Sequence, residues 1–277
     1  MTAGHVREIA PDVFCLGPTG RTQTNVYFVR SGASWALIDA GWAKDGPSIK
    51  GAAGSVFGAD SSPTSILLTH FHPDHAGSAR QLAEIWGCPV HVHPDELPLT
   101  TGDFASISTY AGPLDHWVVL PIMRTIGRER REAVLAASSL RGVSRSFEPG
   151  PHVPGLPGWG CVPTPGHTPG HVSFFRASDR VLITGDALVT LKLNSPAGLV
   201  LGREGLSGPP RYTSWNWPAA RQSVAALARL DPSVVAGGHG SPMRGAGTAS
   251  AVRTFAERFS GRAVARDADE GNGAARG

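Results

Sequence analysis

The sequence has little cysteine and no long apolar run. Among its 277 residues only Cys15, Cys88 and Cys161 are cysteines, and no two of them form a Cys-x-x-Cys pair. Three cysteines among apolar neighbours indicate reduced core residues rather than disulfides, metal ligands or nucleophiles, so a cytoplasmic protein is expected. No apolar stretch approaches the ~20 residues of a transmembrane helix, and residues 1–11 lack the apolar core of a secretory signal.

Charge is also scarce, and it is unevenly distributed. Charged residues make up 17 % of the chain, and its net charge is +3. Residues 121–146 contain six arginines and two glutamates, a local excess of four positive charges. A patch of this size does not indicate a nucleic-acid-binding protein. It is most simply a solvated helix face, although attraction of an anionic substrate or of a membrane surface stays open.

Apolar residues and turn formers are plentiful. Hydrophobic residues make up 41 % of the chain, which is enough to bury a core and excludes wholesale disorder. The 35 glycines and 23 prolines predict many tight turns. The length suits one large domain or two small ones.

Short apolar segments alternate with amphipathic ones along the chain. Strands are expected at residues 13–17, 25–31, 35–40, 65–69, 89–93, 160–163, 172–176, 181–184 and 233–236. Helices are expected at about 44–56 and 74–86, from residue 218 onwards, and at 247–259. Both halves begin with hairpin-like pairs of strands. This order predicts an α/β protein with two mixed β-sheets and helices outside them, a four-layer αββα sandwich.

One segment interrupts this pattern. Residues 95–155 contain an arginine-rich amphipathic stretch at 117–140 between turn-forming segments, which predicts a helical insertion. We expect it to cap the active site, with the apolar residues of 117–126 facing the substrate; a dimer contact or a membrane-surface patch are the alternatives. Residues 1–260 are expected to form the domain, and 261–277 a disordered tail.

The residues that carry chemistry follow a buried strand. The segment HFHPDH at 70–75 places four metal-binding side chains within six positions. Residues two apart on an extended chain point the same way, so His70 and His72 can face one ion. Asp74 and His75 lie where the chain turns into a helix, and they can face a second point. Imidazoles and a carboxylate suit Zn²⁺ and also Fe or Mn.

The segment THFHPDHAG at residues 69–77 resembles the signature of the metallo-β-lactamase-fold hydrolases, the superfamily of glyoxalase II, the lactonases and the class B β-lactamases. The superfamily pattern contains three further ligands: a histidine after a glycine-rich turn, an aspartate after a strand, and a histidine in a glycine loop. The sequence supplies them, in this order, at His167, Asp186 and His239.

The resemblance implies a site for two metal ions, two Zn²⁺ with Fe or Mn as alternatives. One ion is expected at His70, His72 and His167, and the other at Asp74, His75 and His239, with Asp186 bridging them. A hydroxide shared by the ions would attack the substrate. Asp74 would be the catalytic residue that orients this hydroxide and passes its proton to the leaving group.

The bridging Asp186 makes the chain resemble the glyoxalase II and lactonase-like branch more than the class B β-lactamases, which lack it. We therefore predict a hydrolase of small-molecule esters, thioesters or lactones. The alternatives are a di-iron or mono-iron oxygenase or oxidoreductase of the same fold, a phosphodiesterase, or a β-lactamase-like hydrolase. A homodimer is possible, and no nucleic-acid partner is expected.

Other histidines and aromatic residues are weaker candidates. His171 lies four residues after His167, where it is expected to support the site rather than bind metal. His91 and His93 share one face of a strand without a nearby carboxylate, and we expect them to be buried or to lie behind the ligands. Four aromatic residues are expected either to line a substrate pocket or to pack in loops: Tyr110, Tyr212, Trp215 and Trp217.

Overall fold

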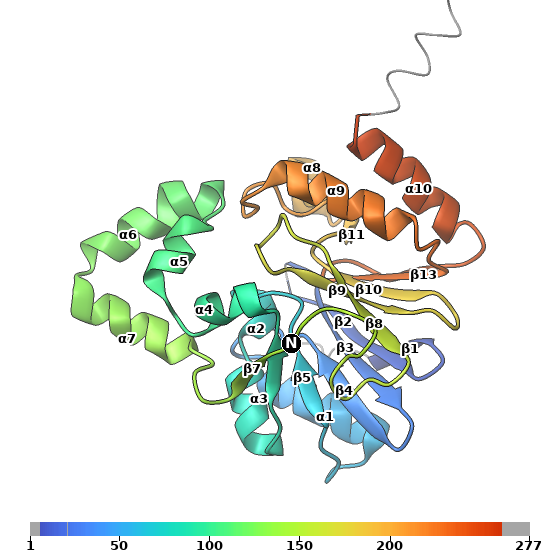
Figure 1. Ribbon diagram of the computed structural model, residues 1–277, viewed down its shortest axis with the longest axis horizontal. Coiled ribbons are helices and arrows are strands. Elements are labelled where there is room, and N and C mark those ends of the chain that lie inside the picture. Colours follow the sequence, from blue (N-terminus) through green and yellow to red (C-terminus); the bar gives the residue numbers. More distant parts are fainter. Residues whose placement is uncertain (1–5, 21, 262–277) are drawn as a thin grey trace, which may run out of the picture.

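Two mixed β-sheets pack face to face in the computed structural model, and helices cover both outer faces (Figure 1). The structure describes residues 6–20 and 22–261. The predicted disordered tail at 261–277 therefore lies outside the described residues, apart from Gly261.

The first sheet has seven strands in the order β1-β2-β3-β4-β5-β6-β7. The strands are antiparallel from β1 to β4 and parallel from β4 to β7. Their bounds are β1 Val6–Ala10, β2 Val13–Thr19, β3 Thr24–Ser31, β4 Ser34–Ile38, β5 Ser65–Leu67, β6 Val90–Val92 and β7 Ser144–Ser146.

The second sheet has five strands in the order β14-β13-β10-β9-β8, of which only the β10–β13 pair is parallel. Its strands are β8 Trp159–Pro163, β9 Val172–Arg176, β10 Val181–Gly185, β13 Val234–Gly237 and β14 Met243–Arg244. A separate antiparallel pair consists of β11 Val189–Leu191 and β12 Glu204–Ser207.

The helices fall into two outer layers and one outlying group (Figure 1). They are α1 Gly46–Phe57, α2 Pro73–Ala76, α3 Ala79–Trp86, the 3₁₀ helix η1 Pro94–Glu96, α4 Leu97–Thr100, α5 Phe104–Thr109, the π-helix η2 Asp115–Val119, α6 Leu120–Thr125, α7 Arg128–Ser138, α8 Pro196–Leu201, α9 Trp217–Ala228 and α10 Thr248–Phe259. In the described part of the chain, no helix has the length and apolar character needed to cross a membrane.

Neighbouring residues of the central strands face different layers of the core. Tyr27 and Val29 of β3 pack between the two sheets, whereas Phe28 faces the layer of α1 and α3. In the second sheet Ile183 faces the space between the sheets, and Leu182 packs toward α9 and α10. This alternation buries both faces of each sheet. The predicted four-layer αββα fold with a helical insertion is confirmed.

Several short elements were not predicted. The strand β1 is an edge strand whose Arg7 and Glu8 are exposed, so its apolar pattern is weak. The strands β7, β11 and β12 have only three or four residues, too few for a clear period. The expected helix at 74–86 is divided into α2 and α3, because the Gly77 N–H donates to Gly41 O (2.9 Å) and the Ser78 hydroxyl donates to Trp42 O (2.6 Å).

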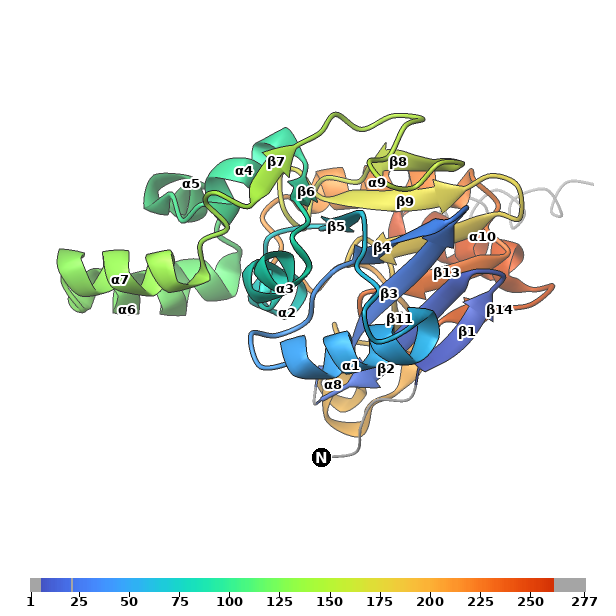
Figure 2. The same ribbon diagram turned by 90° about the horizontal axis from the view of Figure 1, so that it is seen from below.

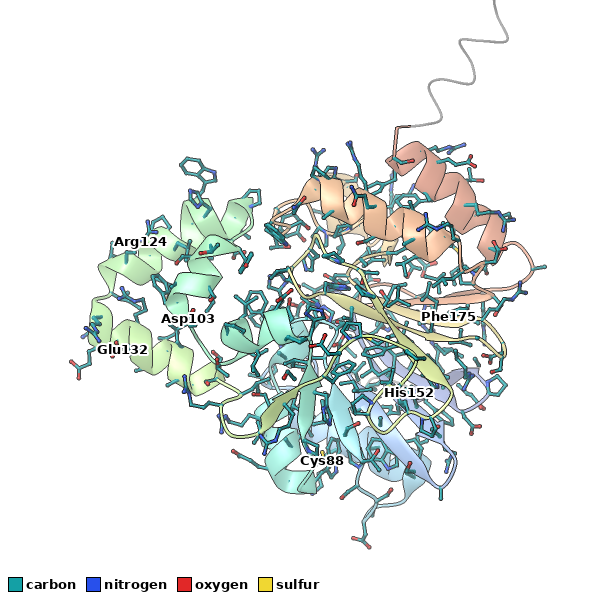
Figure 3. All side chains as sticks on the ribbon, viewed as in Figure 1. Cys88, Asp103, Arg124, Glu132, His152 and Phe175 are labelled. Atoms are coloured by element: carbon teal, nitrogen blue, oxygen red, sulfur yellow. The ribbon has the colours of Figure 1, made fainter. Side chains whose placement is uncertain are left out.

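The helices of the insertion lie to one side of the sandwich. Figures 1 and 2 show α5, α6 and α7 extending away from both sheets, and Figure 3 labels Arg124 and Glu132 on this group. At the base of the insertion, Leu114 N–H donates to Tyr212 O at 2.7 Å. Trp117 is 77 % exposed. That the insertion caps the site, with the apolar residues of 117–126 facing the substrate, stays a prediction.

The first prediction concerns the core beside α1. Trp35 is buried, stacks on Phe57 with ring centroids 4.5 Å apart, and donates from Nε1 to Ser61 Oγ at 2.8 Å. We expect Trp35→Ala to lower the free energy of unfolding by about 3–5 kcal/mol, because it leaves a cavity. The matched variant Trp117→Ala should change it by no more than about 0.5 kcal/mol. Chemical denaturation measures both, and equal losses would contradict this account of the core.

Candidate metal centre

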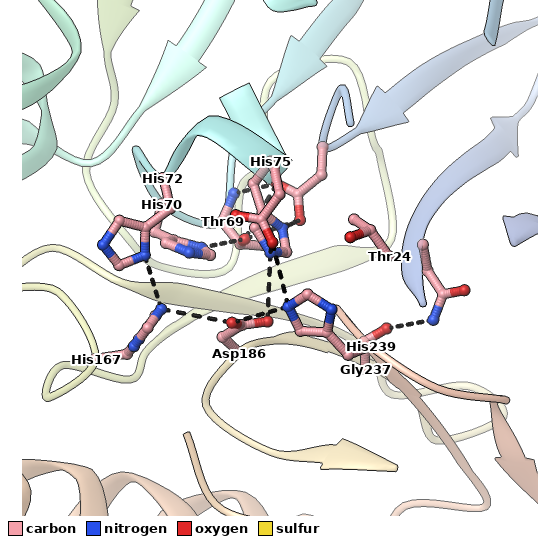
Figure 4. A network of polar contacts seen from close by, with 12 residues as sticks. Thr24, Thr69, His70, His72, His75, His167, Asp186, Gly237 and His239 are labelled. Carbon is pink, nitrogen blue, oxygen red and sulfur yellow. Dashed lines mark hydrogen bonds and ion pairs between the residues drawn. The ribbon is translucent and has the colours of Figure 1, made fainter. Parts of the chain in front are cut away.

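The predicted site residues lie where strands end, at one edge of the two sheets (Figure 4). His70 follows β5, and His75 lies in the short helix α2 that comes next. Asp186 directly follows β10, and His239 comes two residues after β13. Because β10 and β13 run parallel, their C-terminal ends bring Asp186 and His239 to the same edge. His167 enters from the loop between β8 and β9.

Asp186 is the residue that contacts most of the others. Its Oδ2 lies 3.5 Å from His167 Nε2 and 3.2 Å from His239 Nε2. Its Oδ1 lies 3.4 Å from His75 Nε2. On the other side of the cluster, His72 Nδ1 is 2.9 Å from His167 Nε2. One carboxylate thus contacts imidazoles from three different segments of the chain.

The structure brings all seven predicted site residues together. They fall into overlapping groups whose ligand atoms lie within 4.8 Å of one another: His70, His72 and His167; His70, His75 and Asp186; Asp74, His75 and His239. The first and third groups have the membership expected from the sequence for the two ions. Asp186 contacts members of both groups through its two oxygens.

Three polar atoms of this cluster are buried and lack a hydrogen-bond partner: His70 Nε2, His75 Nε2 and Asp186 Oδ1. The last two approach each other at 3.4 Å, but not in hydrogen-bonding geometry. An unsatisfied buried polar atom costs about 1–3 kcal/mol, so three at one point indicate a missing partner. Imidazole nitrogens with a carboxylate oxygen are the donors that zinc and iron prefer. The residues present therefore fit metal ions.

Hydrogen bonds behind the rings determine which nitrogen faces the centre. His75 Nδ1 donates to Asp39 Oδ2 at 2.8 Å, and His239 Nδ1 donates to Thr22 O at 2.7 Å. Carboxylate and carbonyl oxygens only accept, so each Nδ1 carries the proton. The Nε2 atoms of both rings therefore face the cluster, where each can donate a lone pair once it has lost its proton.

In two more histidines, Nδ1 donates to a hydroxyl group behind the ring. His167 Nδ1 lies 3.0 Å from Ser214 Oγ, which donates its own proton to a backbone carbonyl at 2.6 Å. His70 Nδ1 lies 3.0 Å from Thr69 Oγ1, which donates to Asp39. Because each hydroxyl has already used its proton, it accepts from the ring. Both rings therefore also present Nε2 to the centre.

Burial and neighbouring charges shift the pKa values of the cluster in opposite directions. Burial, together with nearby imidazoles, lowers the pKa of His70 and of His167 well below the usual range. Burial also acts to lower the pKa of His75, but Asp186 and Asp74 outweigh it and raise that pKa. Burial opposes ionisation of Asp186, yet the imidazoles around it hold its pKa well below the usual range. Neutral imidazoles and an ionised carboxylate are the forms that bind metal. These directions favour the metal-binding forms of His70, His167 and Asp186, whereas a metal ion at His75 would displace a proton.

The loop that carries His239 is held by residues of the opposite sheet. Asn25 Nδ2 donates to Gly237 O (3.0 Å) and to Gly240 O (2.6 Å), and Tyr27 OH donates to Gly237 O (2.6 Å). A Cβ at Gly238 would contact Asp186 Oδ1 and His75, so only glycine allows the backbone to pass this close. The position of His239 in the centre therefore depends on hydrogen bonds between the two sheets.

Glu96 belongs to the site, and it was missed in the sequence. It is buried at the end of η1, where Oε2 accepts from Phe71 N–H and Oε1 accepts from Gly170 N–H, both at 2.9 Å. It therefore links the loop after β5 to the loop before β9. Burial raises the pKa of Glu96 to about 7. The signal that could have identified Glu96 was its place three residues after the strand expected at 89–93. The end of that strand lies at the same edge as the ends of the strands that carry the metal-binding residues.

Asp39 was also missed, because it lies inside the strand expected at 35–40. It accepts from Thr69 N–H at 2.8 Å in addition to the Thr69 hydroxyl and His75. Its backbone has a φ of 60°, an uncommon conformation outside glycine. An aspartate at the end of the apolar run WALI was the signal that could have identified it.

His171 lies beside the cluster, but both of its ring nitrogens are used. Nδ1 lies 2.8 Å from Thr164 Oγ1, and Nε2 accepts from Asp186 N–H at 3.1 Å. Burial lowers the pKa of His171 to about 3, in keeping with a neutral ring. It therefore positions the backbone of Asp186. His93 Nδ1 accepts from a backbone N–H at 3.1 Å, and His91 packs edge-on against a phenylalanine ring.

Known proteins resemble this chain in sequence over the span that contains the site. A model of the metallo-beta-lactamase superfamily matches residues 19–239, a span that contains all seven site residues. The probable metallo-hydrolase YflN of Bacillus subtilis (strain 168) is 34 % identical over 248 residues, which cover 85 % of this chain and 88 % of YflN.

Two solved structures are also similar. The metallo-beta-lactamase family protein TTHA1429 from Thermus thermophilus has a TM-score of 0.63 at 22 % identity, and the match covers 94 % of this chain and 81 % of that protein. TTHA1623, solved in a di-iron-bound form, has a TM-score of 0.53 at 27 % identity, with 82 % and 92 % covered.

A substitution of Glu96 tests its linking role. Glu96→Gln keeps the shape, but its amide nitrogen cannot accept from a backbone N–H, so one of the two loops loses its hydrogen bond. We expect Zn²⁺ affinity to fall by about 10–100-fold, as for other residues behind metal ligands. Chelator competition measures this affinity, and the exposed Glu129→Gln is the control. Parent-like affinity in Glu96→Gln would show that the link does not matter for metal binding.

Proposed function

The chain belongs to the metallo-β-lactamase superfamily, and we propose that it is a dinuclear metal-dependent hydrolase of small-molecule esters, thioesters or lactones. The observation that carries this proposal is the buried cluster with three unpartnered ligand atoms. The di-iron form of TTHA1623, which is 27 % identical to this chain, supports two metal ions rather than one.

We assign one ion to His70, His72 and His167 and the other to Asp74, His75 and His239, with Asp186 shared. The two oxygens of Asp186, which contact imidazoles of both groups, support the shared role. When bound, two divalent ions supply Lewis acidity that activates water as a nucleophile and polarises an acyl oxygen.

Asp74 is the proton carrier in this proposal. Its Oδ2 lies 3.4 Å from His239 Nε2 and 3.8 Å from His75 Nε2, so it borders the cluster. Its side chain is 16 % exposed, against 4 % for Asp186. A carboxylate that touches both the cluster and solvent can take a proton from the attacking water and pass it to the leaving group.

The cysteines support water as the nucleophile. Burial raises the pKa of Cys15 and of Cys161 to about 12, and that of Cys88 to about 11. The thiolate is the nucleophilic form of cysteine, and it is scarce at neutral pH when the pKa is this high. Covalent catalysis by a thiolate is therefore disfavoured in this chain, and direct attack by water is favoured.

A redox function is the second candidate. It is favoured by the similarity to TTHA1623, whose structure contains two irons. Imidazole and carboxylate ligands suit iron as well as zinc, so the donor set alone does not separate the two functions. The substrate and the consumption of O₂ do.

The deciding experiment is a substrate panel with Zn-loaded and Fe-loaded protein. It contains p-nitrophenyl esters, S-lactoylglutathione and acyl-homoserine lactones, with bis-p-nitrophenyl phosphate and nitrocefin for the phosphodiesterase and β-lactamase alternatives. We expect turnover of at least one acyl substrate, loss on chelation and recovery on adding metal. Uptake of O₂ by the Fe-loaded protein without acyl hydrolysis would overturn the proposal.

The shared role of Asp186 predicts a change in metal content. Elemental analysis of the parent protein should give about two ions per chain. Asp186→Ala removes the carboxylate shared by both groups, so we expect at least one of the ions to be lost on dialysis. Asp60→Ala, which changes an exposed aspartate that is not among the seven candidate ligands, is the control. Two retained ions with full activity in Asp186→Ala would refute the shared site.

The proton-carrying role of Asp74 predicts a loss in kcat. Asp74→Asn keeps the size and an oxygen donor but cannot accept the proton, so kcat on the best acyl substrate should fall by about 100-fold or more. Metal content, measured on the same samples, separates this loss from loss of the ions. If kcat stays near the parent value with the metals retained, Asp74 is not the proton carrier.

A further inference from the structure

A cleft outside the candidate metal centre lies between α9, α10 and β12. It has a volume of about 430 Å³, and none of the seven candidate metal ligands lines it. Figure 1 shows α9 and α10 side by side on the outer face of the second sheet, and α10 contacts β12. The lining comes from residues between Lys192 and Phe259, so it belongs to the C-terminal third of the chain.

The cleft is strongly cationic. No carboxylate lines it, and four basic side chains do: Lys192, Arg211, Arg221 and Arg258. Within residues 6–20 and 22–261, none of these four makes an ion pair with an aspartate or glutamate. Cations gathered in a concave surface without internal counter-charges raise the local concentration of anions.

Aromatic rings form another part of the lining. Trp217 packs edge-to-face on Phe259 (5.2 Å between centroids), and Phe255 stacks on Phe259 (5.4 Å). The guanidinium of Arg211 lies 4.9 Å from the centroid of Trp217. All three rings are only partly buried. A ligand with a planar or apolar portion beside its anionic group would contact both kinds of lining.

The cleft is connected to the metal centre by a short loop. Asn194 Oδ1 accepts from Arg211 N–H at 2.8 Å, and its Nδ2 donates to Pro209 O at 2.9 Å. Three residues after Arg211, Ser214 Oγ lies 3.0 Å from His167 Nδ1. A ligand held by Arg211 therefore contacts the loop that positions His167.

We propose that this cleft binds a phosphorylated organic anion that carries a planar or apolar group. Phosphate is favoured over a single carboxylate because four positively charged side chains line one cleft and three of them are guanidinium groups, which bind phosphate through paired N–H donors. The anion is either a free effector or the phosphorylated end of a substrate. Only the second source depends on the proposed hydrolysis.

The test is calorimetric titration of the metal-loaded full chain with ADP and with inorganic pyrophosphate. We expect saturable binding that weakens with added salt. Arg221→Ala and Arg258→Ala should each weaken ADP binding by about tenfold. Arg229→Ala, an exposed arginine at the C-terminal end of the helix that carries Arg221 but outside the lining, should bind as the parent does.

Three outcomes would overturn the proposal. The first is the absence of saturable binding in the parent, and the second is an equal loss in Arg229→Ala. The third is undiminished binding in both cleft variants, which is the result expected if the phosphates coordinate only the metal ions. None of these readouts requires turnover, so failure of the cleft and failure of the proposed hydrolysis are distinguishable.

Kinetics separate the two sources of the anion. An effector changes kcat or KM for a small neutral ester when ADP is added, and Arg221→Ala abolishes this change. A phosphorylated substrate end instead makes a coenzyme A thioester a better substrate than the N-acetylcysteamine thioester with the same acyl group. Arg221→Ala then raises KM for the first thioester by about tenfold and leaves the second unchanged.

Discussion

The crowding of imidazoles and carboxylates at one buried point is the constraint on which the rest of the site depends. Burial alone disfavours every charged form there, and unpartnered atoms such as His75 Nε2 add to the cost. The fold offsets this with hydrogen bonds that fix the Nδ1 side of four of the rings. Asp39 accepts from His75, a backbone carbonyl accepts from His239, and Ser214 accepts from His167. The Nε2 atoms of these rings are thereby oriented toward the cluster before a metal ion binds.

This pre-orientation depends on hydrogen bonds between the two sheets. The ligands come from both sheets, and neither sheet could complete the cluster alone. Asn25 and Tyr27 on the first sheet hold the carbonyl groups of the loop around His239, which follows the second. The side chain of Glu96 holds the backbone of loops from both sheets. Relative movement of the sheets would therefore break hydrogen bonds at the centre, so the core between the sheets and the site stabilise each other.

The sequence predicted the layers and the first four members of the cluster because both are local patterns, whereas His167, Asp186 and His239 were expected only from the resemblance to the superfamily. The αββα order follows from alternation within single strands, and HFHPDH at 70–75 places four metal-binding side chains within six residues. Glu96 and Asp39 could not be found in this way, because their roles arise only when distant loops meet. The Asp39–His75 contact spans 36 positions, and the contact from Glu96 to Gly170 spans 74. A lone acidic residue after a strand has no period or spacing that reveals such a partner.

The candidate ligand His167, the base of the insertion and the cationic cleft meet at one loop. Residues 208–216 hold His167 through Ser214, accept a hydrogen bond from the base of the insertion at Tyr212 O, and present Arg211 to the cationic cleft. Tyr212 and Trp215 are more than a third exposed on the same loop. A change in its sequence or shape therefore acts at once on a metal-facing ring, on the insertion and on the cleft. Substrate preference can thus diverge through this loop while the ligand set and the four layers remain unchanged.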